Sequence, residues 1–189
     1  MNVFISGGCK NGKSMYAQNL ACEAAREKDC SLYYLATMKP VDDEDLARIE
    51  RHLEEREGLG FITVEQSMDI CGCLKKKVCM DSMTMLQQVD TGGVFLLDSV
   101  TALLSNEMFR EDGSVDMAAP SRVAGQLKQF AALTGNTIFI SDYIYSDAMK
   151  YDDLTEAYRK GLAFIDRTLA EVCGQVIEVS FGQLIYYTK

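Results

Sequence analysis

The residues best suited to chemistry lie near the start of the chain, in a glycine-rich stretch. The pattern G-x-x-x-x-G-K-[ST] is matched without a gap by Gly7-Gly8-Cys9-Lys10-Asn11-Gly12-Lys13-Ser14. Glycine lets such a loop curl so that its backbone N–H groups converge on phosphate oxygens. In this pattern Lys13 would reach the β- and γ-phosphates of ATP or GTP, and Ser14 would ligate Mg²⁺. The apolar run before it and the helical pattern after it favour a phosphate-binding loop over a turn that merely joins strand to helix.

A second candidate is Asp98, which ends the strongly apolar run Val94–Leu97. A carboxylate at the tip of a buried strand suits the second Mg²⁺-directed position of such a phosphate site. The alternative is that Asp98 caps the following helix, which Ser99 could also do. We favour the metal role, because the glycine-rich loop supplies a reason for a charge at this place.

The third candidate is His52, the only histidine. Helical spacing puts Arg48, His52 and Arg56 on one face. Two guanidinium groups would form an anion site and would disfavour protonation of the imidazole, leaving a nitrogen able to attack phosphorus. The spacing alone, however, favours a surface histidine or a member of an ion-pair lattice.

Short apolar runs alternate with longer helical patterns along the whole chain. Strands are predicted at Val3–Ile5, Leu32–Ala36, Phe61–Val64, Val94–Leu97, Thr137–Ile140, Val176–Val179 and Leu184–Tyr187. Helices are predicted at Lys13–Glu27, Asp42–Glu55, Met68–Gln88, Val100–Phe109, Met117–Leu133 and Asp153–Val172. The alternation predicts one α/β domain over residues 1–189, with a mostly parallel sheet, helices on both faces and a C-terminal antiparallel hairpin. Ligands of such sheets bind beyond the carboxyl ends of the strands.

Composition narrows the function classes. The formal net charge of -9 argues against broad nucleic-acid binding, and Lys75-Lys76-Lys77 is interpreted as a solvated helix face. No apolar run approaches the length of a membrane span. Seven cysteines without a signal peptide indicate free thiols in a reducing cytoplasm. A metal site at Cys71, Cys73 and Cys79 is disfavoured, because no further Cys pair or nearby His completes it.

Taken together, these segments resemble the bifunctional adenosylcobinamide kinase/adenosylcobinamide-phosphate guanylyltransferase family of cobalamin biosynthesis. The resemblance is dense from Met1 to about Phe109 and thinner afterwards. It rests on segments in the family's order: Gly7-Gly8, Gly12-Lys13-Ser14, Tyr34-Leu35-Ala36-Thr37, Asp42-Asp43-Glu44, Ala47-Arg48-Ile49, His52 with Arg56, Phe61-Ile62-Thr63-Val64-Glu65, Leu97-Asp98-Ser99-Val100-Thr101, Leu103-Leu104 and Asn106. The segment Arg-Ile-x-x-His-x-x-x-Arg is the most particular of them.

The resemblance implies a RecA-like P-loop NTPase fold, commonly assembled as a homotrimer, and two reactions. One phosphorylates adenosylcobinamide with ATP or GTP; the other transfers GMP from GTP through a guanylylated histidine. Carried over by position, His52 becomes the GMP acceptor, facing the glycine-rich loop. Besides that loop, the nucleotide contacts implied are Leu35, Ala36, Thr37, Leu53, Glu54, Glu55, Arg56, Glu65 and Asp98.

Two later segments depart from the family's pattern. Asp142-Tyr143-Ile144-Tyr145 stands where the family often has Asn-Glu-Val-Gly, and Asp166-Arg167 where it often has Asn-Gln. The tyrosines after the fifth predicted strand could form a substrate-facing wall or a plain surface loop. Two alternatives therefore stay open: a small-molecule kinase without guanylyl transfer, and a non-catalytic nucleotide-binding module.

Overall fold

The computed structural model describes residues 1–79 and 86–187, without the side chains of Glu44, Arg48 and Cys79. Its centre is a seven-stranded sheet in the order β3 (Ile62–Glu65), β2 (Leu32–Ala36), β6 (Val94–Asp98), β7 (Thr137–Asp142), β1 (Val3–Gly7), β8 (Gln175–Ser180) and β9 (Gln183–Tyr187). Neighbouring strands from β3 to β8 run parallel, and β9 pairs antiparallel with β8. The predicted mostly parallel sheet and C-terminal hairpin are confirmed.

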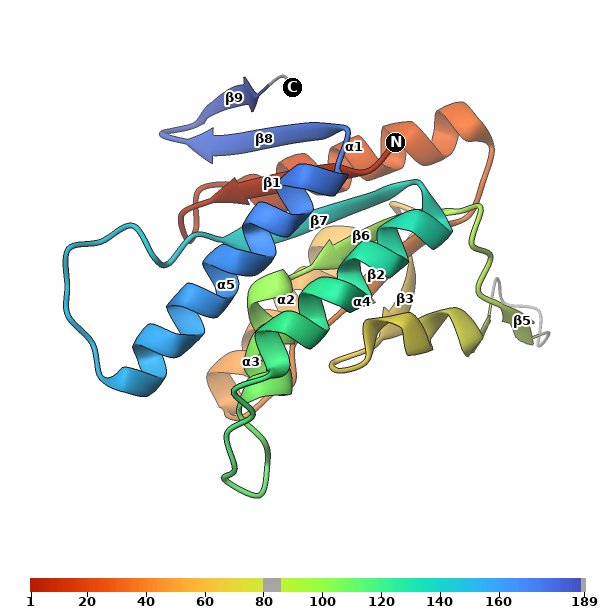
Figure 1. Cartoon of the computed structure of the whole chain (residues 1–189). Coiled ribbons are helices and arrows are strands. Elements are labelled where there is room, and N and C mark those ends of the chain that lie inside the picture. Colours follow the sequence, from red (N-terminus) through yellow and green to blue (C-terminus); the bar gives the residue numbers. More distant parts are fainter. Residues whose placement is uncertain (80–85, 188–189) are drawn as a thin grey trace.

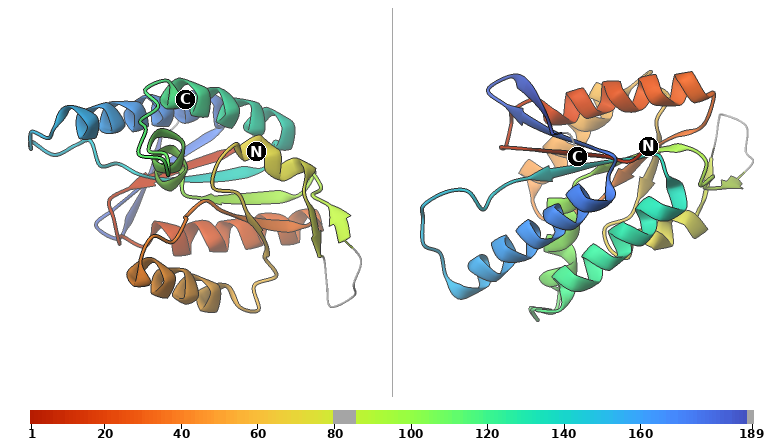
Figure 2. Two further views of the ribbon diagram at one scale, coloured as in Figure 1. Left: turned by 90° about the horizontal axis from the view of Figure 1, so that it is seen from below. Right: turned by 45° about the horizontal axis from the view of Figure 1, so that its top comes forward.

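Helices cover both faces of this sheet (Figures 1 and 2). On one face lie α1 (Lys13–Lys28) and α2 (Asp43–Arg56). On the other face lie α3 (Val100–Met108), α4 (Ala119–Thr134) and α5 (Asp153–Val172). None of the helices within residues 1–79 and 86–187 combines the length and the apolar character that a membrane crossing requires.

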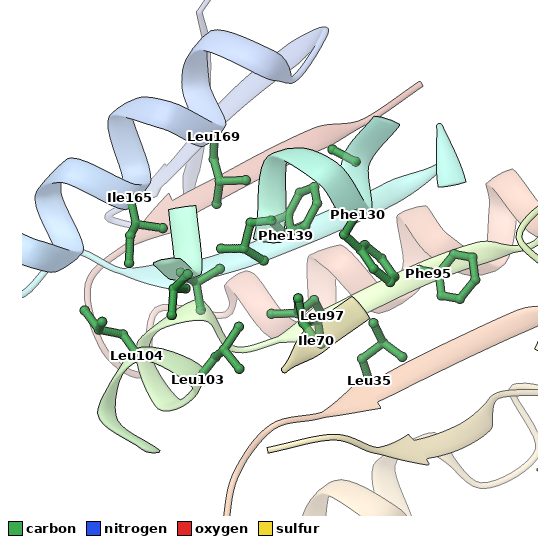
Figure 3. Close-up of a cluster of buried hydrophobic side chains, with 14 of the residues drawn as sticks. Leu35, Ile70, Phe95, Leu97, Leu103, Leu104, Phe130, Phe139, Ile165 and Leu169 are labelled. Atoms are coloured by element: carbon green, nitrogen blue, oxygen red, sulfur yellow. The ribbon is translucent and has the colours of Figure 1, made fainter. Parts of the chain in front are cut away.

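The apolar strands pack differently against the two helical layers. On the α1 face, the small side chains of Ala17 and Ala21 are fully buried beside the sheet. On the opposite face, aromatic rings fill the space: Phe95 and Phe130 meet edge to face, with ring centroids 5.4 Å apart (Figure 3). Strands buried on both faces explain the nearly continuous apolar runs in the sequence.

Two helices begin at capping side chains that lie next to candidate site residues. The Asp42 carboxylate accepts a hydrogen bond from the backbone N–H of Asp45 at 2.9 Å, which starts α2. The Ser99 hydroxyl accepts from the N–H of Ala102 at 3.2 Å, which starts α3. Ser99 therefore caps α3, and this leaves the carboxylate of Asp98 available for another role.

The helix predicted over Met68–Gln88 is wrong where the structure describes this stretch. A 3-10 helix, η1 (Ile70–Lys75), is followed by a small hairpin of β4 (Lys77–Cys79) and β5 (Leu86–Gln88); residues 80–85 lie outside the described residues. Three buried side chains in η1, at Ile70, Cys73 and Leu74, have the spacing of a helical face. That spacing ends with this short 3-10 helix, because the chain is extended at Lys76. The lysine run consequently lies on no α-helix.

Candidate functional site

The glycine-rich loop joins β1 to α1 at the carboxyl edge of the sheet. Its backbone enters the left-handed region at Lys10 (φ 56°) and at Gly12 (φ 88°). A Cβ atom at Gly7 would lie 2.6 Å from the carbonyl oxygen of Val179, so no larger residue fits there. This curled, close-packed backbone is the geometry in which successive N–H groups form an anion-binding nest.

Lys13 lies over this loop with its ammonium group already engaged. The residue is 6% exposed, and its Nζ donates to the carbonyl oxygen of Gly8 at 3.1 Å. The same Nζ forms an ion pair with a carboxylate oxygen of Asp142, at the end of β7. Asp142 was not among the predicted site residues. Its place at the carboxyl end of an apolar strand could have marked it as a site residue, although not as the partner of Lys13.

The Mg²⁺ role of Ser14 and Asp98 stays a prediction, and the structure gives the surroundings of both side chains. Ser14 is half-buried in the first turn of α1, and Asp98 is half-buried at the tip of β6. The Asp98 carboxylate accepts a hydrogen bond from the Tyr34 hydroxyl at 3.1 Å, and no ion pair to it is formed within the described part of the chain. Among the described residues no cluster of three or more His, Cys, Asp or Glu could hold a metal. A phosphate-bound Mg²⁺ needs only one or two protein ligands, because phosphates and waters supply the rest.

A pocket of about 690 Å³ opens where β2, β3 and β6 end beneath α2. We call it the histidine pocket. It brings together His52, Arg56, Glu65 and Asp98, and its other walls are Tyr34, Ala36, Met38, Lys39, Pro40, Leu46, Ile49, Gln66, Ser67, Met68, Lys76, Ser99 and Ala102.

The His52 side chain is oriented by a neighbour on its own helix. Its Nδ1 lies 3.2 Å from Oε2 of Glu55. A carboxylate can only accept a hydrogen bond, so in the neutral imidazole Nδ1 carries the hydrogen and Nε2 keeps a free lone pair. Glu55 is thus the charged partner of His52 that the structure describes. The predicted flanking side chain of Arg48 lies outside the described residues.

Arg56 is the most unusual member of the pocket. It is 7% exposed, and its guanidinium carbon lies 3.5 Å from the centre of the Tyr34 ring. Its Nε and Nη1 atoms are buried and have no hydrogen-bond partner among the described residues. Buried charged donors are costly to leave without an acceptor, so this guanidinium is prepared for an anion.

The predicted nucleotide contacts divide into several groups. Ala36, Glu65, Arg56 and Asp98 line the histidine pocket, and Glu55 contacts its histidine. Leu53 and Glu54 instead border a neighbouring depression. Leu35 and Thr37 are fully buried. The hydroxyl of Thr37 donates to the carbonyl of Ser99 and accepts from its N–H, each at 2.8 Å, so its side chain braces two strand ends.

The glycine-rich loop and His52 are not brought into one pocket. No residue of Gly7–Ser14 lines the histidine pocket. In the sheet, β7 and β6 separate β1 from β2, which at the usual strand spacing puts the two strands roughly 14 Å apart. The expected facing of the imidazole and the loop stays a prediction. Asp98, at the tip of the intervening β6, stands between the two.

The thiols of Cys71 and Cys73, the two described cysteine side chains in η1, are held by burial and by backbone contacts. Burial raises the pKa of the Cys73 thiol to about 12, so it is not a thiolate at neutral pH. The Cys71 thiol donates to the carbonyl oxygen of Gln126 at 3.4 Å, and the Cys79 side chain lies outside the described residues.

A family model and two known proteins match this chain in sequence. A family model described as cobinamide kinase / cobinamide phosphate guanyltransferase matches residues 3–186. The bifunctional adenosylcobalamin biosynthesis protein CobP of Pseudomonas aeruginosa is 24% identical over 180 residues, covering 93% of this chain and 91% of its own. The protein of the same description, CobU, of Escherichia coli K12 is 29% identical over 116 residues, covering 61% and 55%.

A solved protein structure from Pyrococcus horikoshii OT3, described as a structural study of project PH0250, superposes on this chain with a TM-score of 0.52. It is 9% identical and is matched over 100% of this chain and 86% of its own. At this identity the likeness concerns the fold alone. The strand–loop–helix geometry at Gly7–Ser14 and the order of the parallel strands are those of the P-loop NTPase fold, as predicted.

Proposed function

The chain belongs to the cobinamide kinase / cobinamide phosphate guanyltransferase family, and from this premise we propose that it catalyses both reactions on adenosylcobinamide in cobalamin biosynthesis. The observation that carries the proposal is the pairing of His52 and Arg56. The imidazole, with a free lone pair on Nε2, shares a pocket with a buried guanidinium whose Nε and Nη1 have no acceptor among the described residues. That combination suits attack on a phosphorus atom.

The kinase step belongs to the glycine-rich loop. Backbone N–H groups of Gly7–Ser14 would hold the triphosphate, and Lys13 would leave Asp142 to contact the β- and γ-phosphates. The hydroxyl of the acceptor's aminopropanol arm attacks the γ-phosphorus while the bond to the nucleoside diphosphate breaks. Ser14 and Asp98 would hold Mg²⁺, which offsets the charge on the phosphate oxygens when bound.

The transfer step belongs to the histidine pocket. Nε2 of His52 attacks the α-phosphorus of GTP, a P–N bond forms, and the bond to pyrophosphate breaks. A phosphate oxygen of adenosylcobinamide phosphate then attacks the same phosphorus. The P–N bond breaks, adenosylcobinamide-GDP forms and the imidazole is restored. Arg56 would donate to the phosphoryl oxygens in both halves, and Glu55 would hold the imidazole by its Nδ1–H.

The position of Asp98 supports this order of steps. Asp98 lines the histidine pocket, and in the proposed kinase step its carboxylate would also hold the Mg²⁺ of the phosphate site. An acceptor hydroxyl phosphorylated next to Asp98 would carry its new phosphate in the pocket that holds His52. The product of the kinase step is the attacking group of the transfer step.

The decisive experiment is intact-mass analysis after incubation with GTP and Mg²⁺. We expect an adduct of one GMP in the wild type and none in His52→Ala, whose kinase activity on adenosylcobinamide persists. Phosphorylation of the acceptor without any adduct would instead support a small-molecule kinase. Absence of both, with nucleotide still bound, would support a non-catalytic module.

We also infer that the chain forms a homo-oligomer, with a trimer as the expected size. The support is the outer strand β9, which exposes Leu184, Ile185 and Tyr186 next to a fully exposed Phe181. Exposed apolar edge strands are commonly covered by another chain. Light scattering on the purified protein measures the assembly directly, and a monomer at micromolar concentration would contradict it. The free thiols fit a cytoplasmic enzyme.

A further inference from the structure

A second pocket, of about 470 Å³, lies on the opposite side of β1 from the histidine pocket, between α5 and strands β1 and β8. We call it the tyrosine pocket. Figure 1 shows α5 running along this face toward β8. Its lining residues are Phe4, Ser6, Tyr143, Tyr145, Ser146, Asp166, Arg167, Ala170, Val176, Ile177, Glu178 and Tyr187.

Asp166 gives this pocket a hydrogen-bond acceptor without a donor. The residue is 3% exposed. Its Oδ2 accepts from the Ser141 hydroxyl at 3.1 Å and from the Tyr145 hydroxyl at 2.9 Å. Its Oδ1 is also buried, yet it has no hydrogen-bond partner among the described residues. A buried acceptor of this kind favours a ligand that brings an N–H group.

The other walls suit a flat, uncharged group. Tyr143, Tyr145 and Tyr187 supply aromatic rings, and the Tyr187 hydroxyl donates to the Glu178 carboxylate at 2.5 Å. Aromatic side chains stack on the faces of nucleobases. Glu178 adds a carboxylate and Arg167 a guanidinium to the lining, so these two side chains give the pocket no excess positive charge for the phosphate end of a nucleotide.

The tyrosine pocket begins directly beside the glycine-rich loop. Ser6, which lines it, precedes Gly7, and the N–H of Tyr143 donates to the carbonyl oxygen of Gly7 at 3.3 Å. The residue before Tyr143 is Asp142, the ion-pair partner of Lys13. A ligand held by the loop therefore needs only a short spacer, such as a ribose, to reach this pocket.

The strand order decides which end of a nucleotide faces which pocket. Asp98, on β6, lies to one side of β1, and β8 lies to the other side. The γ-phosphate end of a bound triphosphate lies toward the metal-directed carboxylate and Lys13. The nucleoside end must then leave the loop on the side of β8, where the tyrosine pocket opens.

We propose that the tyrosine pocket binds the purine base of the nucleotide on the Gly7–Ser14 loop, with Oδ1 of Asp166 accepting a hydrogen bond from the exocyclic amino group of the base. The proposal rests on the proposed function only in its premise that this loop holds a nucleoside triphosphate. Position 166 is thereby a specificity-determining residue for the kinase step.

The test compares ligands that differ in one group, with affinities measured by calorimetry on the full-length protein. GTP is compared with ITP, which lacks the 2-amino group, and ATP with purine riboside triphosphate, which lacks the 6-amino group. Inorganic tripolyphosphate reports on the loop alone. At pH 8, above the pKa of about 7 of Asp166, we expect loss of the amino group of the preferred nucleotide to weaken binding about tenfold in the wild type, the size of one hydrogen bond to a charged acceptor.

Two variants complete the comparison. Asp166→Leu should weaken the amino-bearing nucleotide about tenfold, abolish the difference between the matched nucleotides and leave tripolyphosphate unchanged. Tyr187→Ala, on the half-exposed outer strand, should weaken every nucleotide without affecting tripolyphosphate. Glu27→Leu, an exposed acidic position on α1, is the control and should change nothing.

Several results would overturn the base assignment. Matched nucleotides of equal affinity in the wild type would do so without any variant. Equal loss of tripolyphosphate and nucleotide in Asp166→Leu would indicate a general effect on the loop. Weaker binding of adenosylcobinamide with unchanged nucleotide affinity would assign the pocket to the acceptor. If neither nucleotide nor tripolyphosphate bound the wild type, the proposed function would fail along with this inference.

Discussion

The guanidinium carbon of Arg56 lies 3.5 Å from the centre of the Tyr34 ring, and the hydroxyl of that tyrosine donates to Asp98 at 3.1 Å. One side chain thus links a buried cation on α2 to the carboxylate at the tip of β6. The ring face stabilises the guanidinium in place of a hydrogen-bond acceptor, although a ring replaces only part of the lost hydration. The arrangement keeps Arg56 inside the histidine pocket, where its Nε and Nη1 have no hydrogen-bond partner among the described residues.

Arg56→Met tests this relationship, because it keeps an unbranched apolar stem and removes the charged guanidinium group. We expect the rate of GMP adduct formation to fall at least tenfold, since the phosphoryl oxygens lose a charged donor. The free energy of unfolding of the ligand-free protein should stay within about 1 kcal/mol or rise, because an unsatisfied buried cation is removed. Intact-mass time courses and urea unfolding measure the two effects.

Arg51→Met is the matched control, since Arg51 is exposed on the same helix. It should change the rate of adduct formation by no more than about a factor of two and leave the free energy of unfolding unchanged. Strong destabilisation by Arg56→Met would mean that the guanidinium is a structural element and would contradict its assignment to an anion.

Glu55→Ala tests how the imidazole is held. Glu55 contacts Nδ1 of His52 at 3.2 Å, so its loss leaves the ring free to rotate and to adopt the other tautomer. We expect adduct formation to slow about tenfold with little change in GTP affinity, as for the loss of a group that orients a catalytic histidine. Glu55→Gln should recover part of the rate, because its carbonyl oxygen can still accept from Nδ1–H.

Glu54→Ala provides the control for this experiment. Glu54 is exposed next to Glu55, but it borders the neighbouring depression and not the histidine pocket. If both variants slowed the reaction equally, the effect would come from the net charge of α2 and not from the contact with Nδ1.

The parts of the site that depend on neighbours in sequence were predictable. The glycine-rich loop lies where its motif predicts, because a strand, a turn and a helix follow one another without a gap. The face shared by His52 and Arg56 follows from helical spacing, and the same spacing explains why Leu53 and Glu54 turn away from the pocket.

Features that depend on tertiary packing were not predictable in this way. The burial of Arg56 under α2 and its contact with Tyr34 join two elements through the fold. Asp142 meets Lys13 only because β7 lies next to β1 in the sheet, and their sequence separation carries no such signal. The helix expected over Met68–Gln88 was wrong because the buried residues of a short 3-10 helix, Ile70–Lys75, have the spacing of a longer α-helix.

Asp142→Asn tests the ion pair that holds Lys13 in the nucleotide-free protein. A carboxylate next to the loop competes with phosphate for the ammonium group and repels phosphate directly. Removing its charge should therefore tighten the binding of tripolyphosphate and of ATP or GTP several-fold, and the gain should shrink at high salt. Calorimetry at two ionic strengths measures it.

Lys13→Ala in the same background separates the causes. It should abolish kinase activity and remove the part of the Asp142→Asn benefit that comes from competition for the ammonium group, so that any remaining gain measures the direct repulsion of phosphate. Glu111→Gln, which neutralises an exposed acid paired with Lys39, is a control for net charge. Weaker nucleotide binding in Asp142→Asn would show that the carboxylate assists binding and would contradict a competition between Asp142 and phosphate for Lys13.

The buried carboxyl of Asp166 makes stability depend on pH. Burial raises the pKa of Asp166 to about 7, against an ordinary value near 4. Because the folded-state pKa is higher, the folded protein retains a proton that the unfolded chain has lost. Its stabilising contribution is present below about pH 4 and is lost as the pH rises through about 7. The free energy of unfolding should thus fall with rising pH.

Asp166→Asn removes this titration while keeping the size of the side chain. Relative to the variant, the wild type should lose on the order of 3 kcal/mol between pH 5 and pH 8, as expected for a pKa displaced from about 4 to about 7. Urea unfolding of both proteins at the two pH values gives the difference, in which the titration of every other group largely cancels. Parallel stability curves would mean that Asp166 is ionised in the folded protein throughout this range, and that the interior around its Oδ1 admits water.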